Sequence, residues 1–160
     1  MSVEKKLAEL GLELPAPLKV PEGLRLPYTA VRIHNNIAYI SGNLPLTSHG
    51  TLLQPLGKVG RDVSIAQASL AARAAGLSIF SSLKRAIDNL DRIESWISLF
   101  GIVNGTDSFD QHPKVINGCS DLLIEVLGFE RGAHSRTAMG GGSLPFNVPV
   151  EIEATVALRN

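Results

Sequence analysis

The stretch AHSRTAMGGGSLPFNVPVEIEATVAL, residues 133–158, decides how the C-terminal part of the chain is expected to fold. Its middle holds Gly140-Gly141-Gly142 and Leu144-Pro145, which is the composition of a connection between two strands. From Val148 to Leu158 apolar and polar residues alternate, as they do along a strand with one buried face. The sequence therefore predicts two strands joined as a hairpin.

Counting outward from that turn predicts one specific pair of residues. If the turn is centred near Ser143 and Leu144, antiparallel pairing places Arg136 directly opposite Glu151. One interpretation of the pair is an ordinary cross-strand ion pair. The other is that Arg136 presents its planar guanidinium to a substrate carboxylate, while Glu151 holds or deprotonates a water molecule. The glycine run is likewise either a flexible bulge or a set of backbone N–H groups that cradle an anion.

Upstream of this stretch, periodicity predicts two helices and a strand. Ser64 and Gln67 form a capping box, and apolar residues recur at three-to-four spacing from there to Ile87, which predicts a long helix. Residues 92–103 predict a largely buried strand. A second helix is expected to begin near Pro113 and to end at Gly128 in a left-handed cap.

The first third of the chain predicts a hairpin behind an N-terminal extension. Residues 31–34 and 37–40 are strand-like and flank Asn35-Asn36, which tolerates the left-handed conformations of a tight turn. Residues 1–20 are expected to be an extension with a short helix and a proline-rich lead-in, and residues 21–160 the domain proper. The order of elements predicts an α+β fold: a mostly antiparallel sheet with two helices packed on one face.

The composition fits one globular domain and excludes several classes of function. With 160 residues, 44% of them hydrophobic, the chain can bury a core without disulfides. Fifteen basic and fifteen acidic side chains cancel, so no global field attracts nucleic acid or an anionic membrane surface. The N-terminus MSVEKKLAEL has charges where a signal peptide needs an apolar core, and no apolar run reaches spanning length, so the expected location is the cytoplasm.

Other residues with reactive side chains have simple structural interpretations. Cys119, the only cysteine, lies on the apolar face of the second helix and is interpreted as a small core residue rather than a nucleophile. The four histidines are scattered, so we expect solvated or locally bonded rings, and neither a metal site nor a two-histidine ribonuclease site is apparent. Asn117, on the same helix as Cys119, is a polar residue without an assigned role.

Several motifs, in this order, resemble the longer branch of the reactive-intermediate deaminase family (RidA/YjgF), also called endoribonuclease L-PSP-like. The similarity spans nearly the whole chain, and the last motif is the most specific. The motifs are LAELGLELP near the start, SGNLP at 41–45, GKVG at 57–60, PKVING at 113–118 and SRTAMGGGSLPFNVPVEIEA at 135–154.

This resemblance implies a chorismate-mutase-like α+β fold that assembles as a homotrimer with ligand clefts between subunits. It also implies that Arg136 binds the carboxylate of an enamine or imine acid and that Glu151 is linked to the hydrolytic water. The positions that match other cleft-lining, substrate-binding residues are Tyr28, Gly42, Asn117 and Ala138, and Ala138 stands where many members have cysteine.

The reaction that the resemblance implies is hydrolysis of 2-aminoacrylate-like intermediates to a 2-oxo acid and ammonia, without a cofactor. Because imines already hydrolyse in water, positioning and a held water suffice for such chemistry. A non-enzymatic trimer that binds a 2-oxo acid remains an alternative, since Arg136 would serve it equally well. Endoribonuclease activity ranks lower, because the chain has zero net charge and no basic aromatic stripe.

Overall fold

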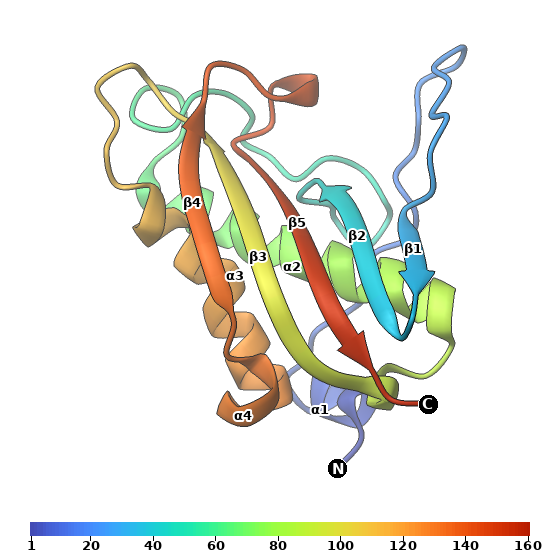
Figure 1. Cartoon of the computed structure of the whole chain (residues 1–160). Helices are drawn as coiled ribbons and strands as arrows, with labels where there is room; N and C mark the ends of the chain where they lie inside the picture. Colours follow the sequence, from blue (N-terminus) through green and yellow to red (C-terminus); the bar gives the residue numbers. More distant parts are fainter.

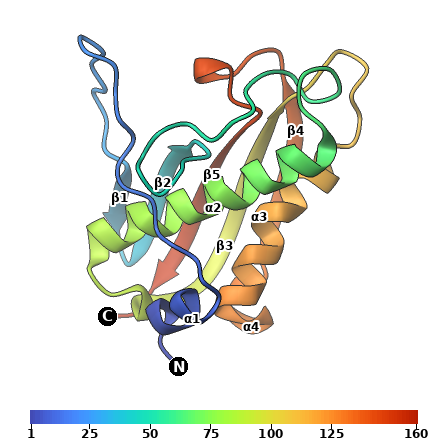
Figure 2. The same cartoon turned by 180° about the vertical axis from the view of Figure 1, so that it is seen from behind.

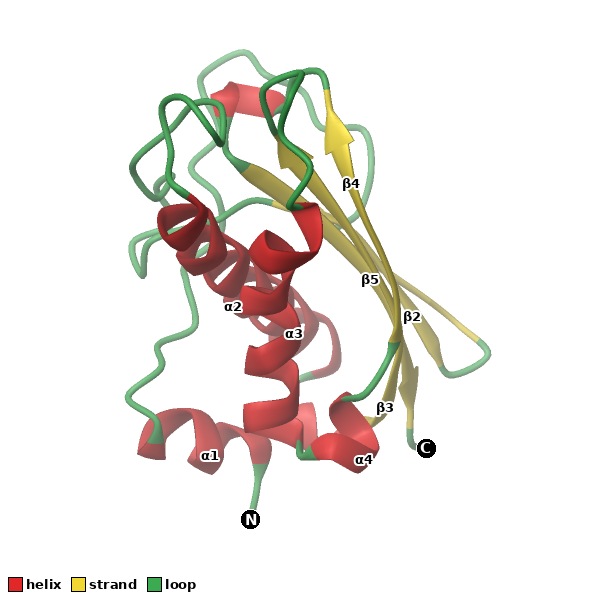
Figure 3. Cartoon of the chain, turned by 90° about the vertical axis from the view of Figure 1, so that its left-hand side faces the viewer, coloured by secondary structure: helices red, strands yellow, loops and turns green.

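The computed structural model describes all 160 residues. They form one sheet with helices on one of its faces. Figure 1 shows the open face of the five-stranded sheet, whose order is β1-β2-β5-β3-β4. The views from behind and from the side show α2 and α3 crossing the same face (Figures 2 and 3). The expected α+β layering is thus confirmed. The elements are α1 (Val3–Glu9), β1 (Val31–His34), β2 (Ile37–Asn43), α2 (Ile65–Ile87), β3 (Ile93–Asn104), α3 (His112–Leu127), α4 (Phe129–Gly132), β4 (Ser135–Gly141) and β5 (Val150–Leu158), with short 3-10 turns at Leu90–Arg92 and Pro145–Asn147.

The β1–β2 hairpin and the long helix form where the sequence predicts them. Asn35 and Asn36 have φ of 49° and 59°, the left-handed values that a two-residue hairpin turn requires. Ser64 caps α2, its side chain accepting from Gln67 N while the Gln67 side chain accepts from Ser64 N. These reciprocal bonds satisfy two amide groups that the first turn of a helix leaves without partners. Both predictions are confirmed.

The segment from β3 to β4 is a crossover through α3, and it makes the sheet mixed. β4 runs parallel to β3, with Ser98 paired to Ser135 and Asn104 to Gly141. A parallel neighbour requires this kind of helical crossover rather than a tight turn. At the end of α3, Gly128 has a positive φ of 78° but an extended ψ of 162°, so the expected left-handed cap is wrong. The chain turns there directly into α4, whose N-cap is the same glycine.

The predicted C-terminal hairpin is also wrong, because β3 lies between its two strands. β5 pairs antiparallel with β2 on one side and with β3 on the other, and it makes no pairing with β4. Along β3, Arg136 is the partner of Leu99, whereas Glu151 is the partner of Ile102. Arg136 and Glu151 therefore do not face each other across a pair of strands.

The connection between β4 and β5, residues 142–149, passes over the end of β3 and is bonded to it. The backbone N of Asn104, the last residue of β3, donates to the carbonyl of Pro149 at 2.9 Å. Lys58 donates through Nζ to the carbonyl of Gly142 at 2.8 Å and to Asn104 Oδ1 at 3.0 Å. These bonds fix the connection across the end of β3. β4 and β5 therefore lie on either side of β3, one strand apart.

The N-terminal helix is part of the same core as the sheet and the long helices. Val3 and Leu7 are only 2% and 3% exposed and belong to the main hydrophobic cluster. Val3 N donates to Asp91 Oδ1 at 2.8 Å, and Glu4 pairs with Lys84 of α2 at 3.1 Å. The extension is therefore packed onto the domain. None of the helices combines the length and the hydropathy that crossing a bilayer requires.

Candidate active site

The six residues expected to form the site fall into two groups in the folded chain. Arg136, Asn117 and Ala138 lie together where β4 packs beside α3. The second group consists of Tyr28, Gly42 and Glu151, which line one cleft beside β2. The first group is called the arginine half-site and the second the glutamate half-site.

In the arginine half-site, two neutral acceptors on α3 hold the guanidinium. Arg136 Nη1 donates to Asn117 Oδ1 at 2.8 Å and to Ser120 Oγ at 3.1 Å. Asn117 and Ser120 are three residues apart on a helix, so their side chains point to the same side. The three ion pairs of the chain involve other residues, and so the Arg136 charge has no carboxylate partner.

Ser120 is hydrogen-bonded to His134, and His134 is in turn hydrogen-bonded to a backbone carbonyl. His134 Nδ1 lies 2.7 Å from the carbonyl oxygen of Gly132, which can only accept, so the ring proton is on Nδ1. In the neutral imidazole Nε2 then accepts from Ser120 Oγ at 3.0 Å, which leaves the serine lone pairs for Arg136. Ser120 is a site residue that was not predicted, and its position one turn after Asn117 on the same helix is the signal that indicates it.

Ala138 and the glycine run continue β4 past the arginine. Ala138 packs against the core, on the same side of the strand as Arg136. Gly140 and Gly141 remain paired with β3, so the interpretation of the run as a flexible bulge is wrong at both positions. A Cβ at Gly140 would lie 2.7 Å from His112 Nε2, so the close approach of the His112 ring to the β4 backbone favours glycine at this position.

In the glutamate half-site, Glu151 lies against the backbone of β2. The register of β2 shifts between Ile40 and Asn43, and this bulge brings Gly42 against the carboxylate. A Cβ at Gly42 would lie only 2.2 Å from Glu151 Oε1, so only glycine leaves room for the carboxylate in this position. Burial raises the pKa of Glu151 above its ordinary value, and the neighbouring Glu153 carboxylate raises it further.

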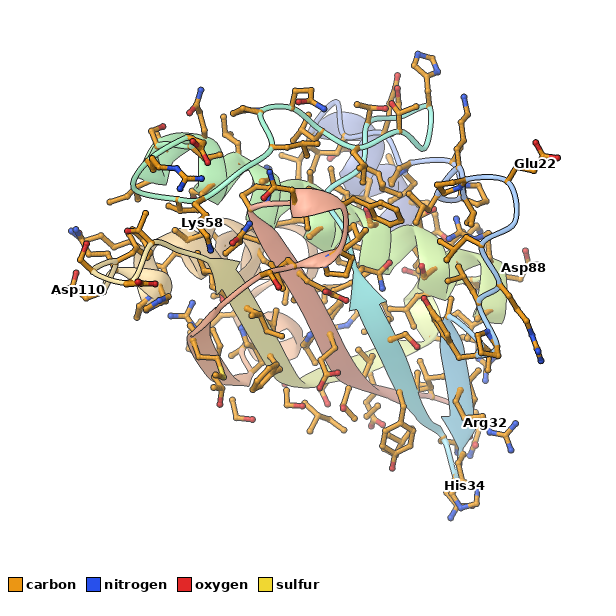
Figure 4. The ribbon with its side chains drawn as sticks, turned by 90° about the horizontal axis from the view of Figure 1, so that it is seen from above. Glu22, Arg32, His34, Lys58, Asp88 and Asp110 are labelled. Carbon is orange, nitrogen blue, oxygen red and sulfur yellow. The ribbon has the colours of Figure 1, made fainter.

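The cleft around Glu151 has a volume of about 630 Å³ and lies between the lead-in segment, the bulge of β2 and α2. The lead-in, residues 15–28, forms one wall and carries Tyr28, which is 60% exposed. It projects beyond β1 (Figure 1). Figure 4 shows its tip at Glu22 on the β1 side of the sheet, with Lys58 on the β3 side. The lead-in thus helps to build the cleft.

Within one chain the two half-sites remain apart. Arg136 points toward α3, on the helical face of the sheet, as its bonds to Asn117 and Ser120 show. Glu151 alternates with Val150 and Ile152, which are buried under the helices, so its side chain points to the opposite face. Two strand spacings and three residues of rise place the Cα atoms of Arg136 and Glu151 about 14 Å apart. The expected site in a single hairpin is therefore replaced by two separate halves.

Comparisons with known proteins agree on one family and one fold. Residues 4–153 match the family described as "YjgF/chorismate_mutase-like, putative endoribonuclease". The curated Protein TCP17 of Trypanosoma cruzi is 35% identical over 146 residues, which are 86% of this chain and 90% of that protein.

Two crystal structures resemble the whole chain. The protein Atu1372 from Agrobacterium tumefaciens, of unknown function, is 39% identical with a TM-score of 0.87, and the match covers 98% of this chain and 92% of that one. A protein described as a "putative endoribonuclease" from Shewanella oneidensis is 32% identical with a TM-score of 0.88, and the match covers 99% and 100% of the two chains.

Proposed function

The chain belongs to the YjgF/chorismate mutase-like family, and we propose that it hydrolyses reactive enamine and imine acids, such as 2-aminoacrylate, to 2-oxo acids and ammonia. The observation that carries this proposal is the arginine half-site. A guanidinium held by Asn117 and Ser120, with no carboxylate partner, is prepared to bind the carboxylate of a small acid in two parallel hydrogen bonds.

We further propose that each active site is shared between two subunits of a trimer. One chain keeps Arg136 and Glu151 on opposite faces of its sheet, so the glutamate half-site of one subunit must receive the arginine half-site of another. Two features support such an assembly. β4 is an edge strand, and the open face of the sheet exposes apolar side chains, with Tyr39 50% and Met139 46% exposed.

In the proposed mechanism, Arg136 binds the substrate carboxylate, and Glu151 of the neighbouring subunit accepts and donates protons. The enamine first tautomerises to its imine, and Glu151 takes a proton from water as the oxygen bonds to C2 of the imine. The C=N π electrons pass to nitrogen, which takes that proton from Glu151 and gives a neutral carbinolamine. Nitrogen then takes a second proton from solvent, the hydroxyl proton passes to Glu151 as the C–N bond breaks, and ammonia leaves with a 2-oxo acid as the second product. A carboxylate whose pKa is raised toward neutrality exchanges protons more readily than an ordinary glutamate.

The test is 2-oxo acid formation from 2-aminoacrylate that a dehydratase generates in the cuvette. Wild type accelerates the reaction, and Arg136→Ala lowers kcat/KM by about 10- to 100-fold, because a hydrogen-bonded charge is lost. Glu151→Gln lowers kcat more than it raises KM. Arg61→Ala is the matched control, since that side chain is 66% exposed and pairs only with Asp62. Full activity in Arg136→Ala would contradict the proposal.

The same proteins separate the deaminase from the two other functions considered. A module that only binds 2-oxo acids would be stabilised by them against heat but would release no ammonia. A ribonuclease would keep its RNA-cleaving activity through purification and would lose that activity in Arg136→Ala. The deaminase proposal predicts ammonia release and no such RNA cleavage.

A further inference from the structure

The cleft around Glu151 is larger than a three-carbon acid requires. Its volume of about 630 Å³ is in the range that proteins use for ligands of cofactor or drug size. Its lining includes Glu151, Gly42 in the bulge of β2, and Ser81, Ser82 and Arg85 on α2. The reacting atoms of a substrate would occupy only the end at Glu151.

A second guanidinium without a carboxylate partner, that of Arg85, also lines this cleft. Arg85 donates through Nη1 to Ser81 Oγ at 2.5 Å and through Nη2 to Ser82 Oγ at 3.2 Å. None of the three ion pairs in the chain includes Arg85. A guanidinium has five N–H donors, so several of those on Arg85 remain available to a ligand. Arg85 thus resembles Arg136 in its chemistry: a cation fixed by neutral acceptors.

The two serines that hold Arg85 have already used their own protons. Ser81 donates to the carbonyl of Pro15 at 2.6 Å, which ties the lead-in to α2. Ser82 donates to Asn43 Oδ1 at 3.1 Å, and Asn43 directly follows the glycine that lies against Glu151. Both serines therefore act on Arg85 as acceptors only. The guanidinium is also linked through Ser82 and Asn43 to the strand that holds the reacting end of the cleft.

Much of the remaining lining of the cleft consists of apolar side chains. They come from the lead-in, from the loop after β2 and from the 3-10 turn before β5, and they include Leu18, Leu24, Leu26, Leu44 and Phe146. Partial burial lowers the pKa of Arg85, because its charged form has lost part of its hydration. A bound anion would replace that lost hydration with charge-assisted hydrogen bonds.

Building on the proposed function, we infer that the substrate is dianionic: an imino or enamino acid with an apolar spacer and a second carboxylate that binds Arg85. Arg136 of one subunit takes the carboxylate next to the reacting carbon. Arg85 of the other subunit, which also supplies Glu151, takes the distal carboxylate. The lead-in, which forms one wall of the cleft, contributes to the selection of the substrate.

The experiment measures binding of paired 2-oxo acids by calorimetry, using product analogues that do not react. Each pair has the same number of carbons, with or without the second carboxylate: 2-oxoglutarate with 2-oxopentanoate, 2-oxoadipate with 2-oxohexanoate, and 2-oxopimelate with 2-oxoheptanoate. At the best length, wild type binds the diacid about tenfold more tightly than its partner. Arg85→Gln abolishes this ratio and leaves the Kd of the monoacid unchanged, whereas Arg61→Ala changes neither.

Two further variants make every outcome decisive. Arg85→Lys keeps the charge and retains part of the preference, and thermal unfolding shows whether each variant is folded. Equal affinity of wild type for both members of every pair, or an equal loss for both in Arg85→Gln, would overturn the inference. Arg136→Ala weakens diacids and monoacids alike. If it weakens neither while Arg85→Gln still abolishes the preference, the Arg136 anchor fails and the Arg85 site stands.

Discussion

Arg136 and Glu151 lie on opposite faces of one sheet, with β3 running between the strands that carry them. Arg136 bonds to α3 on the helical face, and Glu151 lies against Gly42 on the open face. Because strand geometry fixes these directions, no rotamer change brings the two side chains together within a chain. A second copy of the chain is the source of the missing half in the proposed active site.

Removing an acceptor from Arg136 is expected to weaken ligand binding without unfolding the protein. Ser120→Ala deletes one of the two acceptors and frees His134 Nε2 as well. We expect the Kd for 2-oxobutyrate to rise about 3- to 10-fold, as for loss of one hydrogen bond to a charged group. Ser135→Ala is the control, because that hydroxyl bonds to the Ile97 carbonyl instead. Unchanged affinity in Ser120→Ala would show that α3 does not position the guanidinium.

Adding one methyl group at Gly42 is expected to stop catalysis at little cost in stability. Its Cβ would lie 2.2 Å from Glu151 Oε1, the flexible end of a side chain, so the carboxylate must move. We expect Gly42→Ala to lower kcat at least about tenfold, since misplacement of a reacting group by an ångström is costly. Gly142→Ala, whose Cβ would meet nothing within 4 Å, should retain wild-type activity. Equal activity of the two variants would place Glu151 outside the chemistry.

The acid limb of the pH–rate profile is expected to follow Glu151. In the proposed mechanism Glu151 acts as a carboxylate, so the rate falls as pH decreases through the Glu151 pKa, which burial and then Glu153 raise above the ordinary value. Glu153→Gln removes the second cause, so the Glu151 pKa decreases and the limb moves to lower pH. A plot of kcat/KM against pH for both proteins measures the shift. A limb that stays in place, or moves to higher pH, is incompatible with this assignment.

The N-terminal helix is expected to contribute to the stability of the whole domain. Leu7 is 3% exposed and packs into the main core, so Leu7→Ala should lower the free energy of unfolding by about 2–5 kcal/mol. Leu70, which is 64% exposed, provides the control, and Leu70→Ala should change stability by less than about 0.5 kcal/mol. Urea unfolding at a fixed protein concentration measures both. Similar values for the two variants would mean that the extension is not part of the core.

The elements could be predicted from the sequence because their signals are local. Ser64 and Gln67, three residues apart, identify the start of α2. Asn35-Asn36 specifies the turn between β1 and β2 by backbone conformation alone. The order of the strands in the sheet does not follow from such local signals. Gly142 to Pro149 has the composition of a turn, but composition does not say whether another strand lies between the two that it joins. Bonds from Asn104, which is 38 residues earlier than Gly142, decide that question.

The residues of the candidate site stay a prediction, whereas the predicted pairing of Arg136 with Glu151 is wrong. The resemblance to a family identified Arg136 and Glu151, whereas a counted register placed them together wrongly. The contact from Ser120 to His134 spans 14 residues between a helix and a loop, so no periodic pattern indicates it. Arg85 was missed for a similar reason: only folding brings the lead-in alongside α2 and makes it part of a cleft.

Mixing two inactive variants tests the shared active site most directly. Arg136→Ala and Glu151→Gln are unfolded and refolded together, and 2-aminoacrylate hydrolysis is compared with each variant refolded alone. In a ring of subunits that each give Arg136 to one neighbour and Glu151 to the other, about a quarter of the sites in a random equal mixture receive both wild-type residues. The shared site predicts activity near that fraction of wild type. No activity above the separate variants, in mixed assemblies confirmed by mass spectrometry, would contradict it.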